Sequence, residues 1–123
     1  MEEKRIRVVI AYPTRFIRDA LHEAISEDPD FEVIGEVADE GPTVEVANRL
    51  KPDCLIVPLE QEERLVPVWE EVLENNPETK LVAMGPATDV LTIYWKDERG
   101  HVRKTYGTSS REGILDALRY PVA

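Results

Sequence analysis

At 123 residues, with 42% hydrophobic and 33% charged side chains, the chain has the size and composition of a globular protein, and we expect residues 1–123 to form a single domain. Its net charge of −10 repels phosphate backbones, which argues against direct binding to nucleic acid. The single cysteine excludes an internal disulfide, and no stretch has the length of a membrane span or the apolar core of a signal peptide, so we expect a cytoplasmic protein without membrane contact.

Strand and helix signals alternate from the start of the chain. Residues 5–11 (RIRVVIA) predict a strand buried on both faces. Thr14 can cap the helix that follows. The apolar stripe of that helix would consist of Phe16, Ile17, Ala20, Leu21, Ala24 and Ile25. Residues 31–37 (FEVIGEV) alternate between apolar and charged positions, which is typical of a half-solvated strand at a sheet edge.

The same alternation continues through the middle of the chain. Residues 40–50 (EGPTVEVANRL) predict a second helix, and residues 52–57 (PDCLIV) predict a short central strand. Residues 80–84 (KLVAM) predict a fourth strand, which Gly85 and Pro86 would end. Strands and helices in this order predict βαβ units, and therefore a parallel sheet covered by helices on both faces.

A third helix is predicted between the third and fourth strands. Pro67 would break a helix interior but is well suited to a first turn, so the helix should begin there and run to Asn75 or Asn76. Its inner stripe would consist of Val68, Trp69, Val72 and Leu73.

The pattern changes after the fourth strand. Residues 90–95 (VLTIYW) and 101–106 (HVRKTY) are both rich in strand-forming residues. The intervening KDERG supplies turn residues and ends in Gly100, which can take a positive φ. We therefore expect a hairpin where the alternation would otherwise place a fourth helix.

A last helix is predicted from residue 109, where Ser109 and Glu112 would form the two halves of a capping box. Its inward residues would be Ile114, Leu115 and Leu118. The elements together predict a three-layer α/β fold of the flavodoxin-like type, doubly wound, with strand order 2-1-3-4-5 and a five-stranded parallel core. An extra antiparallel hairpin strand near residues 90–106 would replace the fourth helix at the far edge of the sheet.

Several stretches, in this order and spacing, resemble the receiver domains of bacterial response regulators, and most closely the subfamily with a C-terminal helix-turn-helix output domain. They are IRVVIA, RDAL, FEVIGEVAD and KPDCLIVPL within residues 5–85, and SSREGILDALR at the last helix. The resemblance implies a CheY-like fold and a role in two-component signal transduction.

In that family a phosphoryl group is transferred to an aspartate at the end of the third strand, and an acidic pair at the end of the first strand holds Mg²⁺. The resemblance places Pro58 at the position of the aspartate and Tyr12-Pro13 at the position of the acidic pair. None of these side chains offers a carboxylate, so neither the nucleophile nor the metal ligands are present.

The two positions that bind and read the phosphoryl group in the family are also altered. The hydroxyl position falls on Met84 or Gly85, and the lysine position falls near Gly107, although Lys104 is close enough in sequence to supply the lysine. We therefore expect a degenerate receiver (a pseudo-receiver) that is not an enzyme and has no catalytic residue, metal ligand or cofactor.

The degenerate pocket of Tyr12, Pro13, Pro58 and Gly85 allows two interpretations. Side chains can fill the space once taken by metal and water, which we favour. Alternatively, the fold's topological switch point can hold a small molecule over Tyr12, Pro58 and Gly85. Residues 60–63 (EQEE) are expected to form a solvated acidic loop, and Cys54 is expected to lie in the core.

The predicted hairpin carries a second candidate site. Residues 91–106 have a net charge of +2, whereas the remainder has 11 basic against 23 acidic side chains, or −12. Either one of Tyr94 and Trp95 points outward as an interface anchor, or both are covered. The candidate interaction surface consists of Tyr94, Trp95, Arg99, His101 and Arg103.

These observations lead to a functional hypothesis: a phosphorylation-independent, receiver-like module that acts through protein–protein contact. Its partner would be another protein or a second copy of the chain, bound through the hairpin at residues 90–106 and the last helix. The alternative is a doubly wound module that senses a small molecule.

Overall fold

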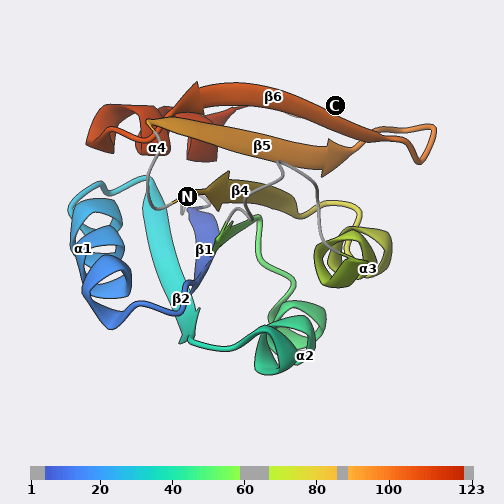
Figure 1. Ribbon diagram of the computed structural model, residues 1–123, viewed down its shortest axis with the longest axis horizontal. Helices are drawn as coiled ribbons and strands as arrows, with labels where there is room; N and C mark the ends of the chain where they lie inside the picture. The colour runs from blue at the N-terminus through green and yellow to red at the C-terminus, as the bar shows by residue number, and fades with distance from the viewer. Residues whose placement is uncertain (1–4, 59–66, 86–88, 121–123) are drawn as a thin grey trace, which may run out of the picture.

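The computed structural model describes residues 5–58, 67–85 and 89–120 (Figure 1). Each predicted strand and helix is present within it, and the bounds differ from prediction by at most a few residues. The elements are β1 (Ile6–Ala11), α1 (Arg15–Ser26), β2 (Phe31–Val37), α2 (Glu40–Leu50), β3 (Cys54–Pro58), α3 (Pro67–Asn75), β4 (Lys80–Met84), β5 (Val90–Lys96), β6 (Val102–Thr108) and α4 (Arg111–Arg119).

The strands form one sheet in the order β2-β1-β3-β4-β5-β6, with β2 at one edge as predicted. Residues of α1 and α4 pack on one face of the sheet, and residues of α2 and α3 pack on the other (Figure 1). The three-layer α/β class is therefore confirmed, and so is the hairpin that replaces the fourth helix.

The parallel part of the sheet is smaller than the sequence predicts. β1, β2, β3 and β4 pair in parallel, but β5 is antiparallel to β4, and β6 is antiparallel to β5. The expected five-stranded parallel core is therefore wrong, and four contiguous parallel strands take its place. The connection from Met84 to Val90 is too short for the crossover that parallel strands require, so β5 must return antiparallel.

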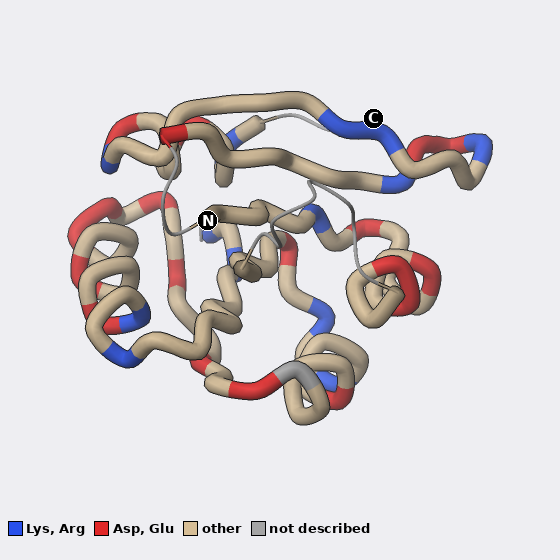
Figure 2. Tube along the Cα trace, viewed as in Figure 1, with Lys and Arg blue, Asp and Glu red and all other residues tan. Residues whose placement is uncertain are grey.

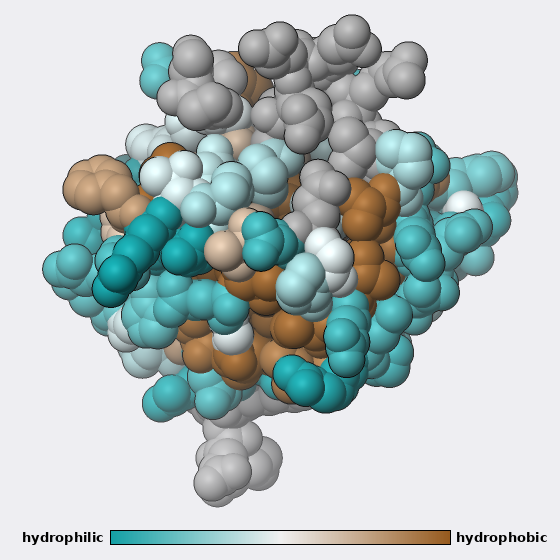
Figure 3. Space-filling view, turned by 60° about the horizontal axis from the view of Figure 1, so that its bottom comes forward, coloured by the Kyte–Doolittle hydropathy of each residue, from teal (hydrophilic) through white to brown (hydrophobic). Residues whose placement is uncertain are grey.

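Two apolar layers hold the sheet between its helices. Consecutive residues of β1 and β3, such as Val9, Ile10, Leu55 and Ile56, are fully buried because they alternate between the two layers. Burying each such side chain contributes about 1.5–3 kcal/mol. Some apolar residues of β2 and α2 are only partly buried. Figure 3, which brings the lower side of Figure 1 forward, shows apolar surface in the middle of that face.

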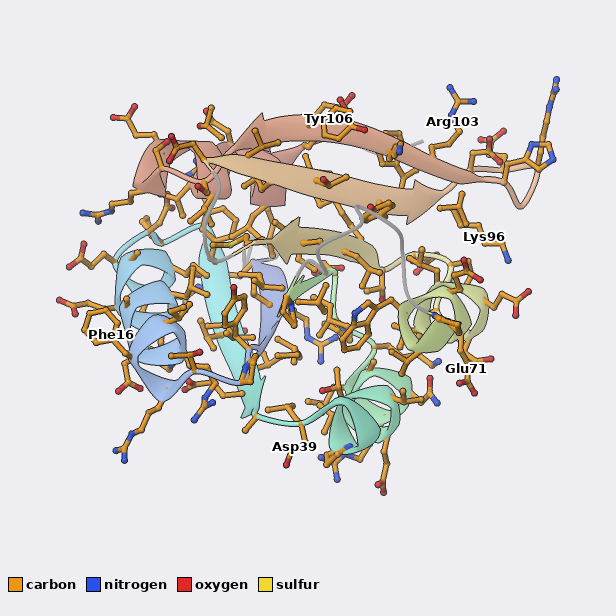
Figure 4. The ribbon with its side chains drawn as sticks, viewed as in Figure 1. Phe16, Asp39, Glu71, Lys96, Arg103 and Tyr106 are labelled. Carbon is orange, nitrogen blue, oxygen red and sulfur yellow. The ribbon has the colours of Figure 1, made fainter. Side chains whose placement is uncertain are left out.

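The predicted apolar stripe of α1 is too wide. Leu21 and Ile25 are buried and Ile17 packs partly against the same layer, but Phe16 is 82% exposed. Ile17, Leu21 and Ile25 are spaced four residues apart and therefore share one face of the helix. Phe16 comes one residue before Ile17, so its side chain is rotated away from that face. Figure 4 shows the Phe16 side chain pointing away from the sheet.

The cap of α4 lies one residue later than predicted. The Ser110 hydroxyl, rather than that of Ser109, accepts a hydrogen bond from the Gly113 amide at 3.1 Å. Glycine is required at that third helical position, because a Cβ on Gly113 would collide with the Thr108 backbone. The predicted capping box with Glu112 is therefore replaced by a serine–glycine pair.

Charged groups fix the C-terminal end of α4. The buried Lys80 ammonium donates to the carbonyls of Leu118 and Tyr120, at 2.8 and 2.7 Å, and so satisfies oxygen atoms that a helix end leaves unpaired. Burial lowers the pKa of Lys80. On the surface, Arg119 pairs with Asp28 and Asp30, which ties the helix to the segment between α1 and β2.

Burial of the single cysteine gives a test of the fold. Cys54 is 1% exposed in the middle of the sheet, and burial raises the pKa of its thiol to about 12. Since only the thiolate reacts, we expect alkylation of the folded protein at about pH 8 to be roughly 1,000-fold slower than alkylation of the unfolded chain, where the pKa is about 8.5. Iodoacetamide labelling followed by mass spectrometry measures both rates. Equal rates would contradict the central position of β3.

The raised pKa of Cys54 also makes stability depend on pH. Below about pH 8.5 both states keep the proton, so the contribution of the thiol is fully present. As the pH rises toward the folded-state pKa of about 12, only the unfolded chain loses the proton, and the free energy of unfolding falls. A Cys54→Ala variant should lose less stability than the unchanged protein over this alkaline range.

Candidate functional site

The carboxyl ends of β1, β3 and β4 meet at one edge of the sheet, because these strands are parallel. Tyr12 and Pro13 follow β1, Pro58 ends β3, and Gly85 follows β4. Pro58 is the direct neighbour of Met84 in the sheet. The structure therefore brings the predicted pocket residues to a single edge, as the family resemblance implies.

Tyr12 fills the side of this edge that faces α1 and α4. Its side chain is 3% exposed and belongs to the apolar layer beneath these helices. The hydroxyl donates a hydrogen bond of 3.0 Å to the carbonyl oxygen of Met84 and so links the ends of β1 and β4. Because burial raises the pKa of Tyr12, the phenol stays neutral and keeps its donor.

Arg18 holds the backbone that carries Tyr12 and Pro13. Its guanidinium donates to the carbonyl oxygen of Tyr12 at 2.8 Å and to that of Pro13 at 3.0 Å. Arg18 lies in the first turns of α1, one turn after the loop that it binds. The cationic group therefore fixes the loop shape at the position where the family has its acidic pair.

The other side of the edge, beneath α2 and α3, is open. A pocket of about 310 Å³ lies there, and its described lining consists of Ala11, Pro13, Ala38, Asp39, Thr43, Pro58 and Trp69. The lining is mostly apolar. The Thr43 hydroxyl is engaged, because it donates to the Asp39 carbonyl at 2.5 Å.

The small-molecule alternative placed its ligand over Tyr12, Pro58 and Gly85. Of these residues, only Pro58 is part of the described lining of the pocket. Tyr12 points to the opposite side of the sheet, so the described pocket does not match this placement and lies instead beside Pro13 and Asp39.

Acidic side chains do not gather at this edge in the part of the chain that the structure describes. No group of three or more His, Cys, Asp or Glu that could hold a metal ion is found among those residues. Asp39 is the one carboxylate in the described lining of the pocket. Asp53 lies at the opposite end of β3, where it accepts a bond of 2.9 Å from the Arg7 amide. Residues 60–63 lie outside the described residues.

The sheet register shows how far the family's lysine position lies from the pocket. Gly107 pairs with Leu91, which pairs with Met84, and Met84 pairs with Pro58, so Gly107 lies in the row of the pocket but beyond β5. Lys104 pairs with Tyr94 in a row further from the carboxyl edge. The suggestion that Lys104 supplies the family lysine is therefore wrong.

The hairpin surface forms only in part. Tyr94 is 4% exposed and lies in the layer beneath α3, so it is not available to a partner. Trp95 is half-buried on the other face, with its ring 5.6 Å from that of Tyr120. The predicted Arg99, His101 and Arg103 are exposed. Together with Trp95 they line a concavity of about 400 Å³ at the turn, which also includes Asp97 and Glu98.

Asp97 organises the hairpin turn. Its carboxylate accepts bonds of 2.9 Å from the amides of Arg99 and His101, and Arg103 pairs with it at 3.6 Å. The bond from the His101 amide is the main reason why the pKa of Asp97 is lowered. Gly100 takes a φ of 82°, as the sequence predicted. Figure 2 shows basic residues along the hairpin and acidic residues along α1 and α3.

Sequence reasoning missed two residues of the site. Arg18 was one polar residue among many on α1, and only the path of the loop shows that its guanidinium reaches back to Tyr12. Asp39 follows β2, so its place at the carboxyl edge was available from the strand order. Trp69 was correctly predicted to lie in the core, at 3% exposure, although it also borders the pocket.

Comparisons with known proteins point to one class. The sequence is 27% identical over 115 residues to the transcriptional regulatory protein LiaR of Bacillus subtilis (strain 168), a match that covers 93% of this chain and 54% of that protein. The response regulator domain of Thermotoga maritima CheB matches with a TM-score of 0.58 at 25% identity, over 67% of this chain and 61% of that chain. No protein-family model matches the sequence.

A further solved structure shares the fold. The isolated REC domain of RcsB from Salmonella enterica serovar Typhimurium matches with a TM-score of 0.60 at 13% identity, over 70% of this chain and 66% of that chain. The chain therefore has the fold of a receiver domain, and its sequence is similar to that of a bacterial transcriptional regulatory protein and of a response regulator domain. It spans about half the length of LiaR. No helix in the described part of the chain is long and apolar enough to cross a membrane.

The Tyr12 hydrogen bond can be tested by a single substitution. Tyr12→Phe removes the hydroxyl and leaves the Met84 carbonyl without this donor, so we expect the free energy of unfolding to fall by about 1–2 kcal/mol. Tyr106→Phe is the matched control, since that ring is 53% exposed, and should change stability by less than about 0.5 kcal/mol. Urea denaturation measures both, and equal values would contradict the role of Tyr12.

Proposed function

We propose that this receiver-type domain signals without a phosphoryl group or Mg²⁺, and that it acts through contact with a partner protein. The observation that carries the proposal is the hydrogen bond from Tyr12 to Met84 beside Pro58, at the edge where the family binds its phosphoryl group. An apolar ring and a neutral donor occupy a place where the reaction needs carboxylates.

Three further features support the same proposal. Arg18 holds the carbonyls of Tyr12 and Pro13 where the family holds a divalent cation, and a guanidinium repels such an ion. β5 separates the lysine position at Gly107 from β4. Among the described residues of this edge, position 58 has no nucleophile, Tyr12 and Pro13 offer no carboxylate, and the lysine position is a glycine. The domain would therefore be a binding module and not an enzyme.

Contact with another protein is the way of acting that the hairpin surface favours. Trp95, Arg99, His101 and Arg103 offer a partner an aromatic edge beside basic groups. The hairpin segment carries +2 on a body of −12, so it would attract an acidic surface. Asp97 holds the turn in one shape, which lowers the entropy cost of binding.

A second candidate function rests on the pocket beneath α2 and α3. About 310 Å³ of mostly apolar space at the topological switch point suits a small ligand, and Asp39 would favour a hydrogen-bond donor or a cation. Such binding would move the indole resonance of Trp69, which borders the pocket. It would therefore be distinguishable from an effect at Tyr12.

The proposal predicts that the protein does not respond to Mg²⁺ together with an analogue of the phosphoryl group. We expect the NMR spectrum and the melting temperature to stay unchanged when Mg²⁺ and beryllofluoride are added together. Asp39 is the one carboxylate in the described lining of the pocket, and it cannot by itself replace both the acidic pair and the aspartate of the family. A receiver domain that keeps its acidic pair and its aspartate serves as the positive control. Shifts in the amides of Tyr12, Met84 or Gly85 at concentrations that saturate the control would refute the proposal.

Restoring the nucleophile alone should not restore the reaction. Pro58→Asp places a carboxylate at the family position, but Tyr12 and Pro13 still provide no metal ligand. Incubated with acetyl phosphate and Mg²⁺, this variant should gain no phosphoryl mass over the unchanged protein by intact-mass spectrometry. Stoichiometric phosphorylation would show that a metal site survives at this edge.

A further inference from the structure

β6 ends the sheet, and one of its faces carries exposed apolar side chains. Directly paired residues of neighbouring strands point to the same side, so Val102, Lys104, Tyr106 and Thr108 share the side of Tyr94, beneath which α3 packs. On that side Val90, Val102 and Tyr106 are 45%, 47% and 53% exposed. Exposed apolar side chains therefore lie on either side of Lys104 along an outermost strand, and an outermost strand with exposed apolar side chains favours pairing with another chain.

Charged residues on an edge strand usually oppose such pairing. β6 carries Arg103 and Lys104, both exposed. Their effect depends on register, however, because like charges destabilise an antiparallel pair mainly where they stand directly opposite each other. The sequence of β6 therefore decides whether two copies can meet.

Two β6 strands can pair over all seven residues in only one antiparallel register, in which Thr105 lies opposite Thr105 of the second copy. Lys104 then lies opposite Tyr106, and Arg103 lies opposite Gly107. Neither cation faces a cation. Lys104 already lies over the ring of Tyr106 within the chain, at 5.8 Å, and the pairing would give it a second ring. Gly107 leaves space for the side chain of Arg103.

Other registers are less favourable. Sliding the strands toward the turn shortens the paired segment. A slide of two residues places Lys104 opposite itself, and a slide of three residues places Arg103 opposite Lys104. Sliding them the other way leaves Val102 and then Arg103 without a partner residue. The longest register is therefore also one that avoids like charges, and this self-complementarity favours a second copy over an unrelated strand.

We propose that β6 pairs antiparallel with β6 of a second copy, across a two-fold axis at Thr105, and joins the two sheets into one. The inference rests on the proposed function, which it deepens by naming a second copy as the partner. The pairing satisfies the outward backbone groups of the edge. It is isologous, so it closes at two chains and does not grow into a fibre.

Opposite charges at residue 106 test the register. Tyr106→Lys places a lysine opposite Lys104 at two symmetric positions, so we expect the dimer dissociation constant from sedimentation equilibrium to rise about tenfold. Tyr106→Glu places an anion at the same positions and should bind at least as tightly as the unchanged chain. Circular dichroism shows that each variant is folded. Equal weakening by both would indicate a general apolar contact and overturn the register.

Cysteine cross-linking gives an independent readout. A mixture of Lys104→Cys and Tyr106→Cys proteins should form a disulfide-linked heterodimer under mild oxidation, because these positions face each other. Each variant alone should cross-link several-fold more slowly. Cys54 does not compete, since it is buried. Equal rates in the mixture and in the separate proteins would contradict the pairing.

The β6 pairing and the proposed phosphorylation-independent action would be refuted by different results. A chain that stays monomeric at high concentration and gives no cross-link overturns the β6 pairing, yet leaves phosphorylation-independent action intact. A response to Mg²⁺ and beryllofluoride refutes that action, yet leaves the dimer intact.

Discussion

The short connection between β4 and β5 is the constraint on which the rest of the structure depends. Because it cannot hold a crossover helix, the chain turns back and β5 runs antiparallel to β4. β5 then takes the place beside β4 and moves β6 one strand outward, by roughly 4.8 Å. The lysine position is thereby separated from the pocket, and β6 becomes an edge with a partly exposed apolar face. One connection thus alters both the candidate site and the surface.

Under the proposed function, the described part of the carboxyl edge differs from a phosphorylated receiver site in charge as well as in composition. Phosphorylation acts by adding negative charge and acceptor oxygens at one place. Here the buried bond between Tyr12 and Met84 is neutral, and the raised pKa of Tyr12 keeps it neutral over the ordinary pH range. Arg18 is already occupied by two carbonyls. These contacts link the described parts of the edge to one another, as the proposed phosphorylation-independent action requires.

Much of this could be predicted from the sequence, because local patterns determine the elements. The alternation up to Met84, the first turn at Pro67 and the positive φ at Gly100 all rest on short-range rules. The predictions were wrong where the position of a residue depends on another part of the fold. The direction of β5 depends on the length of its connection to β4. The exposure of Phe16 depends on its angular position around the helix, one residue before the buried face. The burial of Tyr94 depends on which face of the sheet α3 covers. The open pocket could not be predicted, since it depends on how several loops meet.

The two candidate surfaces are compatible with each other. The turn at residues 97–101 lies at one end of the hairpin, and the Thr105 axis lies on the strand that leaves it. In an antiparallel pair the two turns point in opposite directions, so each Trp95 and Arg99 stays at the outside of the joined sheet. Asp97 fixes each turn through its own backbone and not through the second copy. A dimer of this geometry would present two separate basic turns, and it would bind a partner with two acidic sites more tightly than a single domain could.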